Sequence, residues 1–434
     1  MDSKVDEILK KITPKVDEAE VYTEKLVSTD VDIINDSVNH AKEEDIYGIG
    51  IRIIKDQRQG FAYTTNINRI DETINEAIRN SKLNDQDENL SMIDGNLKYK
   101  KVDGLYDKNL ENVDLPEAIE YSQTLIDITK QEGCNPTSGG YGTSQSYVNI
   151  VNSNGVDVEE IQTGCGASIS VNVEDNDLVS SAYYYDVSHT KDLDLYEIAK
   201  KATKLALDSR GAKPTTSRDS KVVLNHTAAV SLLSTFLSAL NSENKQRGRS
   251  VFKDKLDEQV TSEGFTLIDD GHIPKALRSS ISDAEGTPTQ KTTLIEDGIL
   301  KNFIYDTYRA NIDDVKTTAN AVRGGYTSVP SVGFTNLEFK FKDEYEISEI
   351  DDGIFVNSVM GAHTANPITG DFSVEVMNGF EIQNGCIENP IKKAMISGNI
   401  FEIMNTASAI KSDIRQLGSC ILPQILAENL RITG

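Results

Sequence analysis

Apolar and polar positions along the first 210 residues follow a pattern that occurs twice. Residues 18–83 form the first copy and residues 141–210 the second. In each copy, strand-like segments precede a stretch with apolar residues at i, i+3 and i+4, which is typical of an amphipathic helix. The pattern predicts two antiparallel meander-plus-helix units, which together form an α+β N-terminal region. The segments that correspond are 47–50 with 163–166, 60–63 with 181–185, and the expected helices 71–83 with 195–207.

The second half of the chain has a different pattern. A short polar stretch with Gly211 and Pro214 separates the halves, so we expect domains at 1–213 and 214–434. After it come a strand-like segment, an apolar helix and many short strands, which are divided by Asp-Gly and Asn-Gly turns. This spacing predicts a β-rich sheet or barrel domain with a few helices, including a short helix that ends near Ile410.

The composition of the chain limits the kinds of partner that it is expected to bind. The net charge is −25, with 69 acidic and 44 basic residues, which argues against nucleic-acid binding because that needs a cationic surface. The longest apolar stretch is shorter than a membrane span, and the first residues do not have the pattern of a signal peptide. Four scattered cysteines without a CxxC pair are expected to be reduced thiols. We therefore expect a cytoplasmic protein.

Short motifs in the second half resemble those of one family in type and order. These motifs occupy 283–290, 352–356, 361–364, 370–373 and 396–399. Their order resembles the TldD/PmbA family of zinc metallopeptidase-related proteins, also described as modulators of DNA gyrase. The resemblance implies a peptidase scaffold whose active members carry a His-Glu-x-x-x-His helix. The acidic composition gives no support to a role at DNA.

The helix that corresponds to the zinc motif lacks its ligands. Ser234, Thr235 and Ala239 stand where His, Glu and His are expected. None of the three binds zinc as that motif does, and Thr235 is no carboxylate base. Among the five histidines, no two lie within one helical turn of each other, and His226 at the start of this helix is expected to cap it or to face solvent. The chain is thus similar to the PmbA/TldE-like branch, with no metal or cofactor in this chain and zinc in a partner subunit.

Two segments are candidates for the border of a peptide cleft. Asp283 and Glu285, with the nearby 269–270 pair, could hold a cation or a peptide amino group; alternatively, they anchor a turn built on Gly286 and Pro288. The resemblance implies that the loop 361–373 borders the cleft; the alternative is a structural glycine-rich turn. The candidate residues of this loop are His363, Gly370, Asp371, Phe372 and Ser373.

The resemblance and the missing ligands together lead to one expected function. The chain is expected to be the non-catalytic subunit of a cytosolic TldD-type metallopeptidase complex that acts on peptides or unfolded segments. The alternatives are a self-sufficient metallopeptidase with an unrecognised metal site, and a peptide-binding scaffold protein. The expected partners are a TldD-like zinc subunit and a peptide, with homodimerisation open and neither nucleic acid nor membrane involved.

Overall fold

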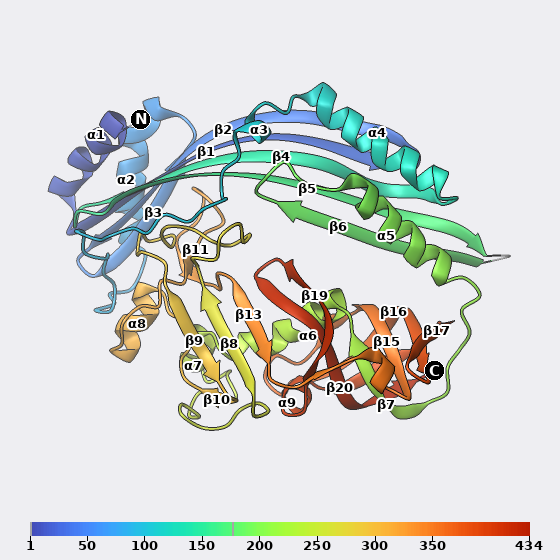
Figure 1. Cartoon of the computed structure of the whole chain (residues 1–434). Coiled ribbons are helices and arrows are strands. Elements are labelled where there is room, and N and C mark those ends of the chain that lie inside the picture. Colours follow the sequence, from blue (N-terminus) through green and yellow to red (C-terminus); the bar gives the residue numbers. More distant parts are fainter. Residues whose placement is uncertain (1, 176–177) are drawn as a thin grey trace.

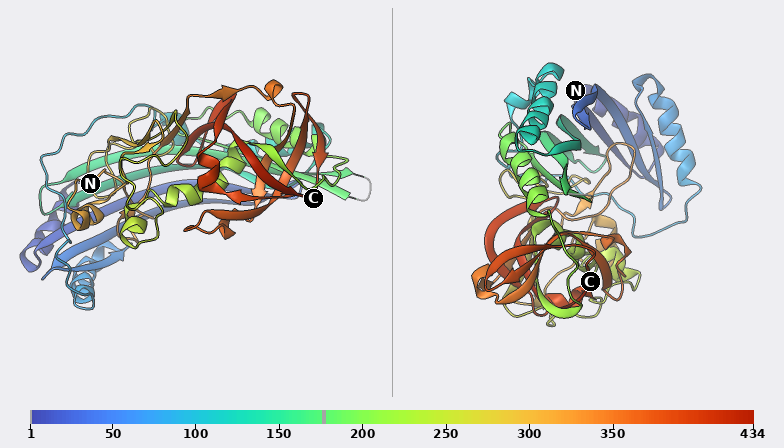
Figure 2. Two further views of the ribbon diagram at one scale, coloured as in Figure 1. Left: turned by 90° about the horizontal axis from the view of Figure 1, so that it is seen from below. Right: turned by 90° about the vertical axis from the view of Figure 1, so that its right-hand side faces the viewer.

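The computed structural model describes residues 2–175 and 178–434, which form two large β-sheets (Figure 1). The first sheet has six antiparallel strands in the order β3-β2-β1-β4-β5-β6. Its strands run along the length of the molecule beside the C-terminal domain (Figure 2). The strands are β1 (Glu18–Ile34), β2 (Ser37–Lys55), β3 (Arg58–Thr64), β4 (Asn135–Asn152), β5 (Asp157–Asp175) and β6 (Leu178–Ser188).

The strand order of this sheet matches the predicted repeat. Three strands followed by a helix occur twice, and the first strands of the two copies, β1 and β4, pair at the centre of the sheet. The α+β prediction of two meander-plus-helix units is confirmed. The strands are longer than the sequence pattern indicates, because β1 and β2 continue through polar residues such as His40. The helices of this region are α1 (Asp2–Ile12), α2 (Ile70–Ser81), α3 (Lys108–Glu111), α4 (Leu115–Gln131) and α5 (Leu195–Asp208).

Along each strand of the first sheet, successive side chains point to opposite faces. On one face, Val31, Ile33 and Ile169 pack under α4 and α5 in one apolar cluster. On the other, Tyr22, Ile150 and Val158 form a smaller cluster with residues of the segment 93–99, between β3 and β4, and of the C-terminal region. We call this second face the inner face. It carries the candidate site.

The C-terminal region contains a closed ring of five strands, β7-β15-β16-β18-β20, because β20 also pairs with β7. The other strands extend this ring into a larger sheet, and α6 (His226–Ser238) packs against the main core. The C-terminal sheet or barrel prediction is confirmed. The strands are β7 (Arg218–Leu224), β8 (Phe265–Asp270), β9 (Lys291–Glu296), β10 (Ile299–Leu300), β13 (Leu337–Phe341), β14 (Glu344–Tyr345), β15 (Asp352–Met360), β16 (Asp371–Gln383), β17 (Cys386–Ile391), β18 (Met395–Asn399), β19 (Ser408–Leu417) and β20 (Cys420–Thr433), with a separate pair β11 (Ala321–Val322) and β12 (Ser331–Val332). The remaining helices are α7 (Ser242–Gln246), α8 (Thr307–Asp313) and α9 (Ile400–Met404).

Two local predictions differ from the structure. The short helix expected to end near Ile410 is α9, which ends at Met404, and Ile410 belongs to β19. His226 does not face solvent: it is buried, its Nε2 lies 2.7 Å from the carbonyl oxygen of Asp413, and burial lowers its pKa. In the described residues, we find no helix of the length and apolar character needed to cross a membrane.

Candidate functional site at the domain junction

A tight turn at Asp283 brings the C-terminal region onto the inner face of the first sheet. The Oδ1 atom of Asp283 accepts hydrogen bonds from the backbone nitrogens of Glu285 and Thr287, both at 2.9 Å. Its Oδ2 accepts from the backbone nitrogen of Ala321 at 3.2 Å. Gly286 has φ +85° and its carbonyl oxygen accepts from the hydroxyl of Tyr99 at 2.9 Å. Asp283 therefore anchors a turn, with both carboxylate oxygens engaged by backbone donors.

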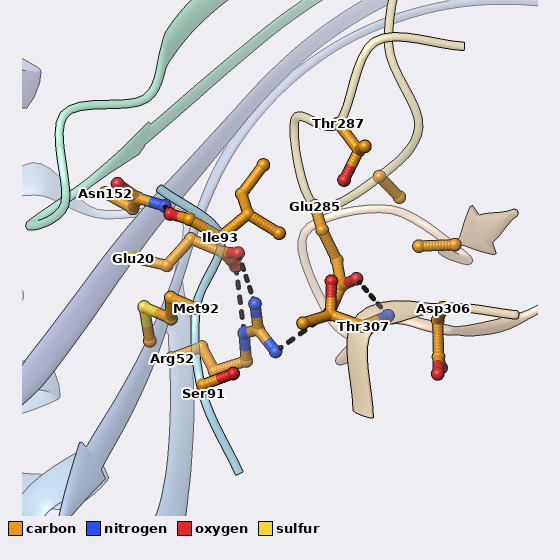
Figure 3. A network of polar contacts seen from close by, with 12 residues as sticks. Glu20, Arg52, Ser91, Met92, Ile93, Asn152, Glu285, Thr287, Asp306 and Thr307 are labelled. Atoms are coloured by element: carbon orange, nitrogen blue, oxygen red, sulfur yellow. Dashed lines mark hydrogen bonds and ion pairs between the residues drawn. The ribbon is translucent and has the colours of Figure 1, made fainter. Parts of the chain in front are cut away.

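Glu285 has a different role, because it takes part in a buried ionic network between the two regions (Figure 3). Arg52 Nη2 lies 2.7 Å from Glu20 Oε2, and Arg52 Nη1 lies 3.4 Å from Glu285 Oε1. Glu285 Oε2 also accepts from the backbone nitrogen of Thr307 at 2.9 Å. Arg323 pairs with the other oxygen of Glu20. Such pairs tolerate burial only where hydrogen bonds satisfy the remaining polar atoms, as they do here for both carboxylates.

The pKa values of the carboxyl groups at this junction are shifted in opposite directions. Burial raises the pKa of Glu20, but the charges of Arg323 and Arg52 outweigh it, so the pKa lies below its ordinary value. Burial and then the negative charge of Glu285 raise the pKa of Asp283 to about 8. The same two causes raise the pKa of Asp306 to about 6. The junction thus contains an anionic Glu20 beside carboxyl groups that hold their protons more tightly.

A cavity of about 190 Å³ lies between the inner face and this turn. Its floor comes from β1, β4 and β5, and its other walls come from the segments around Ser282 and Arg323. A shallower hollow of about 450 Å³ lies further along the same strands, over a glycine- and serine-rich part of the sheet. The residues around the smaller cavity are Tyr22, Ser146, Val148, Ile150, Val158, Glu160, Gln162, Ser280, Ser282, Asp283, Ala284 and Arg323.

In the part of the chain that the structure describes, the hydrogen bonds of the loop 361–373 do not connect it to this junction. His363 is exposed, and the loop turns at Gly361 and Gly370, with φ of +93° and +85°. Asp371 accepts from Asn399 Nδ2 at 2.9 Å, and this hydrogen bond is the main cause of its lowered pKa. In the described residues, the hydrogen bonds of Asp371 tie this loop to the β18–α9 corner and not to the Asp283 turn. Within the loop, Phe372 is buried whereas Ser373 is exposed.

The positions predicted to correspond to the zinc motif, two in α6 and Ala239 at its C-cap, differ in their burial. Ser234 is exposed, and its hydroxyl donates to the carbonyl oxygen of Ser231 at 2.8 Å. Thr235 is buried, and Ala239 is only 1% exposed within the main core. These side chains offer neither imidazole nor carboxylate, so they do not fit a zinc ion. Across residues 2–175 and 178–434, we find no group of three His, Cys, Asp or Glu residues placed to hold a metal.

Comparison with known proteins places the chain in a family. Models of PmbA/TldA metallopeptidase domains match residues 19–81 (domain 1), 108–210 (central domain) and 217–434 (C-terminal domain). The chain belongs to the PmbA/TldD family. The resemblance in the motif order is thereby confirmed.

Relatives of this PmbA/TldD member match it along nearly their whole length. An uncharacterised protein of Methanocaldococcus jannaschii is 38% identical over 94% of this chain and 95% of its own. The metalloprotease PmbA of Escherichia coli O157:H7 is 25% identical over 95% of this chain and 92% of its own. The crystal structure of TldE from Thermococcus kodakarensis superposes with a TM-score of 0.93 at 25% identity, covering 99% of this chain and 100% of that one.

The sequence pattern missed the residues that join the two regions of this PmbA/TldD protein. Arg52 interrupts an otherwise apolar run in β2, and a lone charge in a buried strand is a signal that a partner exists. Its partner Glu285 is 233 residues away in sequence. No local pattern identifies such a pair. Arg323 lies in a glycine-rich loop where nothing in the sequence marks it as buried.

Proposed function

We propose that this chain is the non-catalytic subunit of a TldD-type metallopeptidase complex that acts on peptides or unfolded segments. The observation that carries the proposal is the sequence of α6 and its C-cap, where Ser234, Thr235 and Ala239 stand at the positions for which the resemblance implies His, Glu and His. A family member can keep the scaffold and lack the metal ligands if another subunit of the same complex supplies the ligands. The expected partner is a TldD-like subunit that carries zinc.

The inner face supports a role in enclosing substrate. Two adjoining hollows lie along β4 and β5, and one of them has a floor of small residues that includes Gly142 and Gly166. Small side chains allow another backbone to approach closely. This chain would therefore contribute walls and polar contacts to an extended segment, while water activation takes place on the partner.

Two alternatives remain as outcomes of the test. A self-sufficient metallopeptidase requires about three protein ligands and a base, and α6 offers none. A peptide-binding scaffold without a peptidase partner would use the same inner face. Only a test of assembly with a TldD-like subunit distinguishes this alternative from the proposed role.

Assembly is tested with the two purified proteins. We expect this chain to co-elute with a TldD-like subunit from a size-exclusion column and the zinc of the complex to equal that of the partner alone. Separate elution at micromolar concentration, or a tightly held metal in this chain alone, would contradict the proposal.

A further inference from the structure

A second cavity, of about 670 Å³, lies between α5 and the barrel strands β15 to β17 (Figure 1). Among the described residues, it shares no lining residue with the two hollows of the inner face. Its wall is apolar at Phe355, Phe380 and the exposed Ile387, and Leu205 of α5 packs against the same cluster. Small-molecule sites are typically apolar cavities of about 300–1,000 Å³ with a few polar groups. The cavity therefore has the size and the apolar surface of such a site.

Lys201 brings a positive charge to this cavity. Its Nζ donates to the hydroxyl oxygen of Tyr184 at 3.2 Å and lies 5.1 Å from the centroid of that ring. The neighbouring Lys204 pairs with Asp208. Lys201, in contrast, forms no ion pair within the described part of the chain, although its side chain is exposed and lines the cavity. Its ammonium group is therefore accessible to an anion.

Arg415 adds a second positive charge near Tyr184. Its guanidinium carbon lies 4.6 Å from the centroid of the Tyr184 ring, and its Nη2 donates to the carbonyl oxygen of Tyr185 at 3.3 Å. Burial lowers the pKa of His226, and the positive charges of Arg415 and Lys201 lower it further, so the two cations act on the same place. They create a region of positive potential in a chain whose net charge is −25.

Two further groups of the wall are hydrogen-bond donors. The hydroxyl oxygen of Tyr184 accepts from Lys201, so its own hydrogen is left to donate. The side-chain oxygen of Asn357 accepts from Asn225 Nδ2 at 2.7 Å, which leaves the amide nitrogen of Asn357 as a donor. Together with the ammonium group of Lys201, these donors favour a ligand group that only accepts hydrogen bonds and carries a negative charge, such as a carboxylate.

We propose that this cavity binds a small amphipathic carboxylate, which pairs with Lys201 and places its hydrocarbon or aromatic group against Phe355 and Phe380. The C-terminal residue of a peptide and a free fatty acid share this chemistry. Because the site lies outside the inner face, it does not depend on the proposed role in peptide handling.

The test is isothermal titration calorimetry of the full chain with two acids, N-acetyl-L-phenylalanine and octanoate, each compared with its neutral amide. We expect at least one acid to bind saturably and at least tenfold more tightly than its amide, because only the acid pairs with Lys201. If N-acetyl-L-phenylalanine binds more tightly than octanoate, the ligand is the C-terminal residue of a peptide. The reverse order indicates a fatty acid.

Lys201→Gln is expected to weaken binding of the acid at least tenfold. The matched control is Lys200→Gln. Lys200 makes the same contacts with Tyr196, with Nζ 3.2 Å from the hydroxyl oxygen and 5.0 Å from the ring centroid. It does not belong to the described lining of the cavity. Both substitutions remove one positive charge from α5, so only the loss of the direct ion pair distinguishes them, and Lys200→Gln should leave the affinity unchanged.

Glu388 provides a test of the opposite sign. It is exposed, lines the cavity and has no ion-pair partner in the part of the chain that the structure describes. Its charge repels an anionic ligand, so Glu388→Gln should tighten binding of the acid about threefold.

Three results would overturn the assignment. The first is that neither acid binds at millimolar concentration, or that each binds no more tightly than its amide. The second is an equal loss of affinity in Lys200→Gln and Lys201→Gln, which would mean that the acid binds elsewhere. The third is weaker binding of the acid by Glu388→Gln, which would mean that Glu388 contributes to recognition and that the ligand group beside it is not an anion.

Discussion

The guanidinium of Arg52 and the carboxylate of Glu285 lie 3.4 Å apart across the junction between the first sheet and the C-terminal region. Both side chains are almost completely buried, at 6% and 3% exposure. Arg52 also holds Glu20, so a single cation serves one carboxylate from each region. Removal of this cation leaves Glu285 without its ion-pair partner and leaves Glu20 with Arg323 alone.

Arg52→Gln is therefore expected to destabilise the chain strongly. Breaking a buried pair by removing one partner costs about 3–5 kcal/mol. The measurement is urea unfolding followed by tyrosine fluorescence, since the chain has no tryptophan. The control is Lys11→Gln, which removes the exposed pair with Asp71 and should cost less than about 1 kcal/mol. Equal effects of the two substitutions would mean that the network does not hold the regions together.

Asp283 is expected to make stability depend on pH. Its pKa is raised from 3.8 to about 8 in the folded chain, so the protonated carboxyl stabilises the fold fully below pH 3.8. That contribution declines above this pH and is lost as the pH rises through about 8. Asp283→Asn imitates the protonated group and removes the titration.

The measurement compares the urea midpoints of Asp283→Asn and wild type at pH 5, 7 and 9. The difference should move in favour of the variant between pH 5 and 9. Asp127→Asn, at an exposed position of α4, is the control for a lost surface carboxylate and should show no such trend. A constant difference for Asp283→Asn would mean that Asp283 is ionised throughout.

Gly48 is expected to be required by the side chain of Tyr326. A Cβ atom at Gly48 would lie 2.1 Å from Cγ of Tyr326, so the ring and the loop that carries Arg323 must move. Overpacking of this kind costs about 1–3 kcal/mol. Gly166, a strand glycine of the second repeat, has its nearest contact at 3.8 Å and should tolerate alanine. The thermal midpoints of Gly48→Ala and Gly166→Ala test this, and restoration of the midpoint by adding Tyr326→Ala identifies the ring as the cause.

Introducing the His, Glu and His of the zinc motif is not expected to create a zinc site. Ser234→His should be tolerated because the position is exposed. Ala239→His should lower the thermal midpoint markedly, because Ala239 is in the main core and an imidazole has no room there. Elemental analysis of the triple variant with Thr235→Glu should find no stoichiometric zinc. A folded triple variant with one tightly bound zinc would mean that the scaffold has kept the geometry of the metal site.

Local sequence patterns were sufficient to predict the repeat, the α+β N-terminal region and the β-rich C-terminal region. Periodicity placed α2 and α5 to within two residues, because amphipathic helices are local in sequence. The motif order also led to the family, and the apolar helix expected after the first strand-like segment of the second half is α6. The pattern did not reveal the length of β1, since the part of the strand before residue 30 carries polar residues such as Glu24 and Lys25 that only strand pairing explains.

The candidate site was only partly predictable for a related reason. The turn at Asp283 follows from local chemistry, since a short carboxylate with a glycine nearby is typical of turns. The ion pair of Glu285 and the burial of Arg323 depend on contacts with β1 and β2, which are more than 200 residues away in sequence. Such contacts become visible only when the two regions are placed together.

Peptide hydrolysis by the separate and mixed subunits tests the central claim most directly. An unfolded peptide is incubated with this chain, with a TldD-like subunit, and with both, and cleavage is followed by mass spectrometry with and without a chelator. We predict no cleavage by this chain alone, and chelator-sensitive cleavage by the mixture that exceeds that of the partner alone by at least tenfold. Robust cleavage by this chain alone, or equal cleavage by the partner with and without it, would contradict the account.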